Sequence, residues 1–265
     1  MTLTFAAAEW GGEFHVPPVS ELFELPTIID LGPYFSINRV VIITWFAVGF
    51  TMLLFGLAFS NASIVPGKLQ AAAEAIVSFV RDQVATEIIG PDGRRFVPFL
   101  TTLFMFVWFN NLFEVIPAVN FPATSKIALP MFLALLVWVL FIFLGMKSQG
   151  PVRYLREVAF PPGVPWPLYV LLTPIEIVST FILRPFTLMV RLFANMVAGH
   201  ILLTIIFIAA HVFFYARPGL PIGIIAGLIA GPVLIGFEIF ISTLQAYIFI
   251  LLTSVYIGGA LHPEH

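Results

Sequence analysis

The chain has 265 residues, of which 60% are hydrophobic, 15% aromatic and only 10% charged. Its mean hydropathy of +1.04 is far above that of soluble domains, in which roughly a quarter of the residues are charged. The 12 basic and 14 acidic residues leave a net charge of −2, which argues against a broad basic surface for nucleic acid. Cysteine is absent, and this excludes disulfides, thiolate metal sites and thiol nucleophiles. The composition therefore predicts an all-α integral membrane protein rather than a soluble enzyme.

The first 37 residues form a polar segment without Lys or Arg. The segment contains neither the basic n-region nor the apolar h-region of a signal peptide. We therefore expect residues 1–37 to be a retained N-terminal tail and residues 38–265 to form a single polytopic membrane domain. The acidic residues of the tail are Glu9, Glu13, Glu21, Glu24 and Asp30.

Three charge-free runs, at residues 40–60, 96–113 and 127–146, are bounded by charged or polar residues. Each is close to the roughly 20 residues that cross a hydrocarbon core of about 30 Å as a helix. The pattern predicts an N-terminal transmembrane helix and a transmembrane hairpin. Between them, residues 66–89 show apolar side chains at helical spacing but carry too many charges to cross. This amphipathic helix is predicted to lie along the cytoplasmic interface, or to pack on other cytoplasmic protein.

The C-terminal half is apolar almost throughout, and two interpretations remain open. Pro185 and Gly231-Pro232 are either true breaks that separate four short spans, or interruptions within two helices of roughly 40 residues, each about 60 Å long. Helices of that length have to lie steeply tilted and sheltered by protein. Periodicity alone does not decide between the two.

The distribution of Lys and Arg predicts the orientation. If the segment after the first span is cytoplasmic, seven basic residues lie on that side and three on the other. The N-terminus is then outside, and the C-terminus is cytoplasmic if the last half crosses twice. The seven are Lys68, Arg81, Arg94, Arg95, Lys147, Arg153 and Arg156, and the three are Arg39, Lys126 and Arg217.

Several residues in the C-terminal half carry charge where the membrane is expected, and each is a candidate functional residue. Arg184, next to Pro185, is explained most simply by snorkelling to the interface. Arg191 lies about 10 Å further along a helix, where an arginine costs roughly 3 kcal/mol. The full set is Glu176, Arg184, Arg191 and Glu238, with His200 and His211 as titratable companions.

Helical geometry sorts these residues into faces at about 100° per residue. Arg191 shares a stripe with Ala194, Asn195 and Ala198. The small residues of this stripe favour close contact with a partner helix. His200 lies about 180° away, on the opposite face. Further along, Glu238 and Gln245 share a stripe. Gly223, Gly227 and Gly231 follow the spacing of closely packed membrane helices.

The run from Arg191 to His200, RLFANMVAGH, resembles the signature of subunit a of rotary F-type ATP synthases. The run from Glu238 to Phe249, EIFISTLQAYIF, is similar to the last helix of that family. Pro174-Ile175-Glu176, Arg184-Pro185 and Asn111-Leu112 match in the same order. The resemblance covers nearly the whole chain after the N-terminal tail.

The resemblance implies a stator subunit beside a rotating ring of c subunits, with two offset aqueous half-channels for protons. Arg191 is implied to face the ring carboxylate and to favour its ionised form. Asn195 and Gln245 match polar positions near this arginine. His200 and Glu238 match an interacting imidazole and carboxylate in the half-channel open to the outside, and Glu176 matches a carboxylate of the exit path.

The resemblance also implies two long tilted helices, at about 167–212 and 220–260, packed against the ring. Two departures from the family pattern stand out. Ala194 replaces a glycine found in many members, and Glu176 is separated from Arg184 by one residue more than in some relatives. The second departure leaves the orientation of Glu176 open.

The implied partners are the c-subunit ring, the b subunits of the peripheral stalk, the remainder of the complex and the bilayer of a bacterial plasma membrane. No cofactor, metal site or catalytic site is expected in this chain.

Gly145-Met146-Lys147-Ser148 lacks the leading glycines of a phosphate-binding loop, so direct nucleotide binding is not expected. Haem ligation by His200 and His211 is disfavoured because the chain offers no facing pair.

Two other classes of function remain as alternatives. A proton-coupled secondary transporter would also use intramembrane Glu, His and Arg, but the sequence shows no internal repeat and no polar cluster of substrate size. A purely structural membrane anchor would leave proton flux unchanged when Arg191 or Glu238 is replaced.

Overall fold

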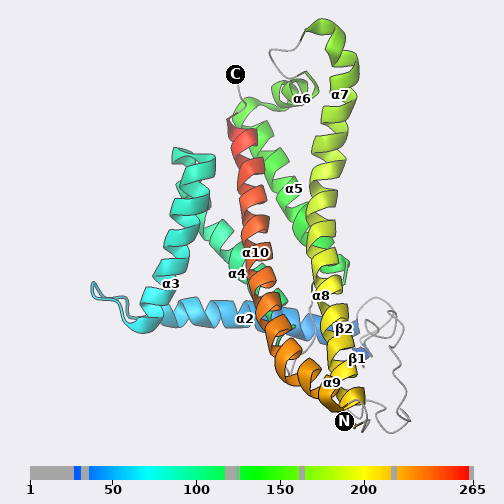
Figure 1. Cartoon of the computed structure of the whole chain (residues 1–265). Helices are drawn as coiled ribbons and strands as arrows, with labels where there is room; N and C mark the ends of the chain where they lie inside the picture. Colours follow the sequence, from blue (N-terminus) through cyan, green and yellow to red (C-terminus); the bar gives the residue numbers. More distant parts are fainter. Residues whose placement is uncertain are drawn as a thin grey trace.

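The computed structural model describes residues 27–30, 36–116, 124, 126–160, 165–215 and 220–262 (Figure 1). Most of the predicted N-terminal tail, residues 1–26 and 31–35, lies outside the described residues. Four helical stretches in the described part are long and apolar enough to cross a membrane, which confirms the predicted class of all-α membrane protein.

The first span is α2 (Arg39–Phe59), a helix of 21 residues. The Asn38 side chain caps it, because its Oδ1 accepts a hydrogen bond of 3.1 Å from the Val41 N–H. A short antiparallel pair, β1 (Thr27–Asp30) and β2 (Ser36–Asn38), precedes the helix. These strands were not predicted from the sequence, because an isolated two-stranded pair has too few residues for a clear alternating pattern.

The amphipathic segment forms α3 (Lys68–Phe79), which continues as the π-helical η1 (Val80–Ile89). Ala73, Val80 and Val84 are fully buried, whereas Lys68 and Arg81 are exposed. Gly90, with φ of +85°, ends the segment, and the 3-10 helix η2 (Pro91–Phe96) leads into the hairpin.

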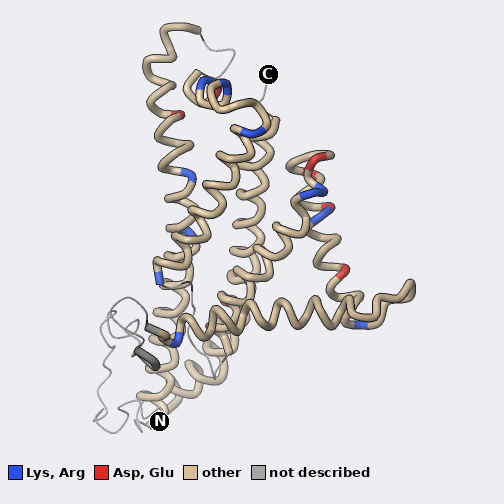
Figure 2. Tube along the Cα trace, turned by 180° about the vertical axis from the view of Figure 1, so that it is seen from behind, with Lys and Arg blue, Asp and Glu red and all other residues tan. Residues whose placement is uncertain are grey.

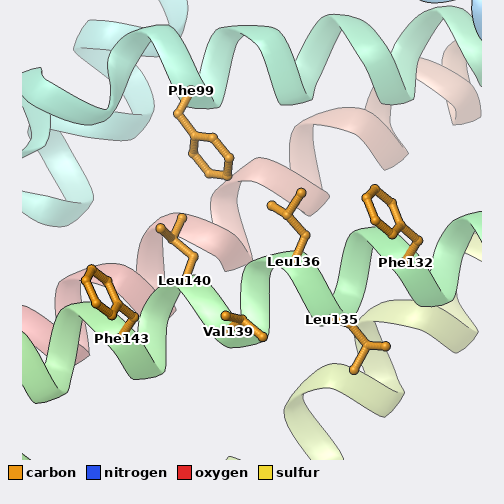
Figure 3. Close-up of a pocket in the computed structure, with 7 residues that line it drawn as sticks. All are labelled: Phe99, Phe132, Leu135, Leu136, Val139, Leu140 and Phe143. Atoms are coloured by element: carbon orange, nitrogen blue, oxygen red, sulfur yellow. The ribbon is translucent and has the colours of Figure 1, made fainter.

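The predicted hairpin corresponds to α4 (Val97–Leu112) and α5 (Ala128–Gln149), which both pack on α10 (Gly231–Leu261). The 16 residues of α4 are not among the four stretches long enough to cross a membrane. Trp108 Nε1 donates a hydrogen bond of 2.9 Å to Thr243 Oγ1, and Gln149 Nε2 donates one of 3.0 Å to the Ala260 carbonyl. An open apolar groove of about 480 Å³ runs between α4 and α5, with α10 behind it (Figure 3). The groove is lined by Phe99, Phe132, Leu135, Leu136, Val139, Leu140 and Phe143.

A short helix, α6 (Pro151–Ala159), follows α5 and folds back on it. Tyr154 is only 4% exposed, and its ring packs so closely on Gly145 that any Cβ there would overlap the ring. Figure 2 shows charged residues gathered in α6 and in the η1–η2 region, whereas the long helices are largely free of charge.

The C-terminal half contains two long helical runs, and neither Pro185 nor Gly231-Pro232 interrupts them. After the 3-10 turn η4 (Trp166–Leu168), the first run comprises α7 (Tyr169–Val178), the π turn η5 (Ser179–Leu183) and α8 (Arg184–Tyr215). The second comprises α9 (Leu220–Ile224), the π-helical η7 (Ile225–Ala230) and α10. The membrane-compatible stretches measure 49 and 42 residues.

The two runs lie side by side in antiparallel directions, as Figure 1 shows for α8 and α10. The predicted glycine stripe lies in this contact. A Cβ at Gly223 would overlap the backbone of Phe214, and one at Gly227 would lie 3.5 Å from the Cβ of Ala210. Small residues at four-residue spacing thus let the two backbones approach closely, as predicted.

Candidate functional site

Arg191 lies on an exposed face of α8 together with Ala194 and Ala198. The opposite side of the helix is buried, since Met196 and His200 are 0% and 6% exposed. The Arg191 guanidinium is thus presented outward from the protein core, next to small side chains. An arginine in a membrane-spanning helix needs a polar or charged partner, so this face is suited to another protein chain that carries one.

His200 lies on the buried side of the same helix and is 6% exposed. Its Nδ1 is 3.5 Å from Oε1 of Glu114, a residue just beyond the end of α4 that is 1% exposed. An imidazole and a carboxylate at this separation can share a proton with little rearrangement, directly or through one water molecule.

Glu238, on α10, is 4% exposed and reaches the same region from the other side. Its carboxylate packs against Gly199, where a Cβ would overlap the carboxylate atoms. The glycine next to His200 therefore makes the room that Glu238 occupies. Glu238 also lies within electrostatic range of Glu114. Three titratable groups, from the end of α4, from α8 and from α10, thus meet inside the protein.

Glu114 was missed as a functional residue in the sequence analysis. It ends a charge-free run, and the sequence therefore indicates only a span boundary there. A usable signal was present in Asn110 and Asn111, two amides within one turn of the carboxylate. Both amides lie inside the charge-free run 96–113, and polar residues inside a membrane span are costly and commonly functional.

The titratable groups are surrounded by buried amides and hydroxyls. Thr124 Oγ1 donates a hydrogen bond of 2.8 Å to Asn111 Oδ1, and Asn110 Nδ2 donates one of 2.7 Å to the Phe106 carbonyl. Many other buried polar atoms of this region accept or donate no hydrogen bond within the described residues, although Glu114 Oε1 lies in the ion pair with His200. Such atoms favour bound water, so this interior is suited to a hydrated path. They are Asn110 Oδ1, Asn111 Nδ2, both Glu114 carboxylate oxygens, Asn195 Nδ2, Glu238 Oε1, Ser242 Oγ and Gln245 Nε2.

Gln245 faces α8 at the level of Arg191. The antiparallel packing brings Glu238 to Gly199 at one level and Tyr256 to Arg184 at another. Gln245 lies between these two levels on α10, as Arg191 does on α8. Gln245 is 5% exposed, and Asn195 is half-buried one turn after Arg191.

Arg184 and Glu176 lie apart from this cluster. The Arg184 guanidinium lies over two aromatic rings, 5.4 Å from the centroid of Tyr256 and 6.0 Å from that of Phe141. Arg184, which we expected to snorkel to the interface, thus makes cation–π contacts with these two rings. Glu176 is half-buried on α7, on the far side of the π turn η5. Among the described residues, no group of three His, Asp or Glu side chains is arranged to hold a metal ion.

The fold and the site define a polytopic membrane protein of the ion-translocating class, with an outward-facing arginine and a buried set of titratable groups on opposite sides of one helix. Comparison with known proteins identifies the family. Residues 41–258 match the ATP synthase A chain family. The chain belongs to this family.

Individual members of this family are similar to this chain over most of their length. ATP synthase subunit a of Frankia alni is 44% identical over 253 residues, which cover 94% of this chain and 87% of that protein. The subunit of Rhodococcus erythropolis is 41% identical, with 100% and 95% covered. That of Pseudarthrobacter chlorophenolicus is 38% identical, with 97% of each covered.

Proposed function

We propose that this chain is the proton-conducting stator subunit of an F-type ATP synthase. Two half-channels meet at the level of Arg191, where a carboxylate on a ring of c subunits exchanges its proton. The observation that carries the proposal is the placement of Glu114, His200 and Glu238 in the interior behind the exposed face of Arg191.

The buried cluster acts as the proton relay of the half-channel that opens to the outside. An imidazole carries one nitrogen that can donate a proton and one that can accept it, so His200 can take up a proton on one side and release it on the other. Glu114 contacts this imidazole, and Glu238 lies within electrostatic range of Glu114, so the three groups can pass a proton along one another. The surrounding amides and hydroxyls of α4 and α10 support water along the path.

Arg191 provides the electrostatic step between the two half-channels. A guanidinium beside the ring carboxylate favours its ionised form and therefore favours proton release. The same positive charge raises the energy of a hydrated proton that tries to pass directly between the channels. Asn195 and Gln245, at this level, tune the hydration of the guanidinium.

The arrangement of the helices supports a steep tilt for the long runs. Figure 1 shows α2 crossing the direction of α8 and α10. If α2 stands upright in the bilayer, the long runs lie far from the membrane normal. Their 49 and 42 residues correspond to roughly 74 and 63 Å, about twice the hydrocarbon thickness. The face of Arg191 then lies along the rim of the c ring.

The proposed setting is a bacterial plasma membrane, with the N-terminus outside and the C-terminus in the cytoplasm. The positive-inside bias supports this orientation, because α3, η1, η2, the end of α5 and α6 together carry the seven Lys and Arg residues of the proposed cytoplasmic side (Figure 2). The further partners are the b subunits of the peripheral stalk and the remaining subunits of the complex. The membrane potential contributes to the drive, at about 2.3 kcal/mol for each charge moved through 100 mV.

The decisive experiment is ATP-driven acidification of inverted membrane vesicles that contain the whole complex with Arg191→Ala. We expect acidification to be lost while the chain still co-purifies with the other subunits, and we expect passive proton leak to increase. Full pumping by an assembled Arg191→Ala complex contradicts the proposal.

A further inference from the structure

We infer that the π turn η5 holds Glu176 in rotational register with Arg184 and Arg191, so that one stripe of the first long run carries all three side chains. The inference rests on the proposed function and deepens it, because this stripe then lines the exit half-channel. It also accounts for the additional residue between Glu176 and Arg184.

The register follows from helix geometry. Arg184 and Arg191 are seven residues apart, and at about 100° per residue they differ by only about 20° around the axis. Glu176 is eight residues before Arg184. In a continuous α-helix, this spacing would turn its side chain about 80° away from Arg184. A π bulge absorbs one residue, so the separation becomes equivalent to seven α-helical residues and Glu176 returns to within about 20° of Arg184.

The hydrogen bonding shows the bulge directly. The Arg184 N–H donates to the Ser179 carbonyl, five residues earlier, rather than to the residue four positions before it. The π turn covers Ser179–Leu183 and therefore lies between the two charged residues. π turns within α-helices are rare and are frequently found at functional sites.

The helix is anchored on both sides of the π turn. On the C-terminal side, Arg184 lies over the rings of Tyr256 and Phe141, at 5.4 and 6.0 Å. On the N-terminal side, Thr173 Oγ1 donates a hydrogen bond of 2.6 Å to the Ala159 carbonyl. Neither end is free to rotate, so an additional residue has to be accommodated between them.

Length changes in the π turn test the inference. Ile182 lies in the turn and is 58% exposed, so its deletion removes no core side chain. Deletion of Ile182 converts the turn to α-helix, leaves Glu176 on the stripe, and is expected to leave proton pumping undiminished. Insertion of one alanine after Ile182 turns Glu176 off the stripe. We expect it to lower pumping by about tenfold or more, to the level of Glu176→Gln, because it removes a positioned proton-transfer group.

A rescue variant separates register from general damage. With the insertion present, Ile177 takes the position relative to Arg184 that Glu176 has in the native chain. Combining the insertion with Glu176→Gln and Ile177→Glu is therefore expected to restore pumping, whereas Ile177→Glu without the insertion is not expected to replace Glu176. A general packing defect from the insertion would not be repaired by moving the carboxylate.

All variants are measured in inverted vesicles with the assembled complex, next to Arg191→Ala and Ile182→Ala. Full pumping by the insertion variant, no effect of Glu176→Gln, or an assembled rescue variant that stays inactive would each overturn the inference. If the insertion variant fails to assemble, the Ile182 deletion variant still tests the inference. An assembled deletion variant that does not pump would also overturn the inference. Full pumping by Arg191→Ala would instead reject the proposed function itself.

Discussion

The position of Glu238 depends on a side chain that is missing from the facing helix. Gly199 has no Cβ, and the carboxylate occupies the space that a methyl group would fill. This contact places Glu238 against the residue that precedes His200 and within electrostatic range of Glu114, which is 3.5 Å from His200 Nδ1. A proton relay depends on distances of this order, so small displacements in this cluster have large effects on proton transfer.

Replacement of Gly199 by alanine tests this packing. We expect Gly199→Ala to displace the Glu238 carboxylate and to slow ATP-driven proton pumping by about tenfold or more, with the complex still assembled. Gly56→Ala, in α2, is the matched control, because a Cβ at Gly56 meets no atom within 4 Å. Equal pumping by the two variants would show that the tight contact at Gly199 is not needed.

Replacement of Glu114 tests the third member of the cluster. Glu114→Gln keeps the size of the side chain but removes its ability to carry a proton, so we expect pumping to fall by about tenfold or more. The exposed Glu87→Gln, in η1, controls for the loss of one negative charge. An assembled Glu114→Gln complex with the wild-type pH profile and rate would remove Glu114 from the relay.

At the level of elements, the glycine stripe of the second long run sets its distance from α8. Gly223 and Gly227 share the stripe, but their surroundings differ. A Cβ at Gly223 would overlap the Phe214 backbone, whereas one at Gly227 would make an ordinary contact of 3.5 Å with Ala210. Backbone atoms in packed helices move less easily than the ends of side chains, so the two positions should differ in tolerance.

We therefore expect Gly223→Ala to destabilise the pair of long runs by about 1–3 kcal/mol, the usual cost of overpacking. Its complex should dissociate at a lower temperature than the wild-type complex. Gly227→Ala should dissociate close to the wild-type temperature. The dissociation temperatures of both variants are measured by heating the detergent-purified complex. A lower dissociation temperature for Gly227→Ala than for Gly223→Ala would contradict the tight packing at Gly223.

At the scale of the whole molecule, the direction of α2 relative to the long runs sets how the protein lies in the membrane. The orientation can be tested with single cysteines, because the native chain has none. Ile64, after α2, and Val152, in α6, are 103% and 80% exposed and are proposed to be cytoplasmic. Ile127, before α5, is 51% exposed and is proposed to lie outside.

We expect Ile64→Cys and Val152→Cys to react with a membrane-impermeant thiol reagent only in inverted vesicles, where the cytoplasmic face is outward. Ile127→Cys should react only in right-side-out vesicles. Reaction after the membrane is opened with detergent controls for intrinsic reactivity. The opposite pattern would reverse the proposed orientation and would exchange the entry and exit sides.

Much of this protein could be predicted from the sequence, because membrane insertion and helix faces depend on local properties. Hydropathy alone indicates the protein class and the first span, and the regular turn of a helix places Arg191, Asn195 and Ala198 on one stripe. The same geometry separates His200 from Arg191, and the structure has one exposed and the other buried.

Tertiary structure decided the features that depend on residues far apart in the chain. The contact of Glu114 with His200 joins a residue just beyond α4 to a residue of α8, and no local pattern connects them. The fit of Glu238 against Gly199 depends on how closely two helices approach, which is a property of packing. The π turn before Arg184 lies between two parts of the helix that contact other elements, so the register that we infer for Glu176 depends on the folded protein.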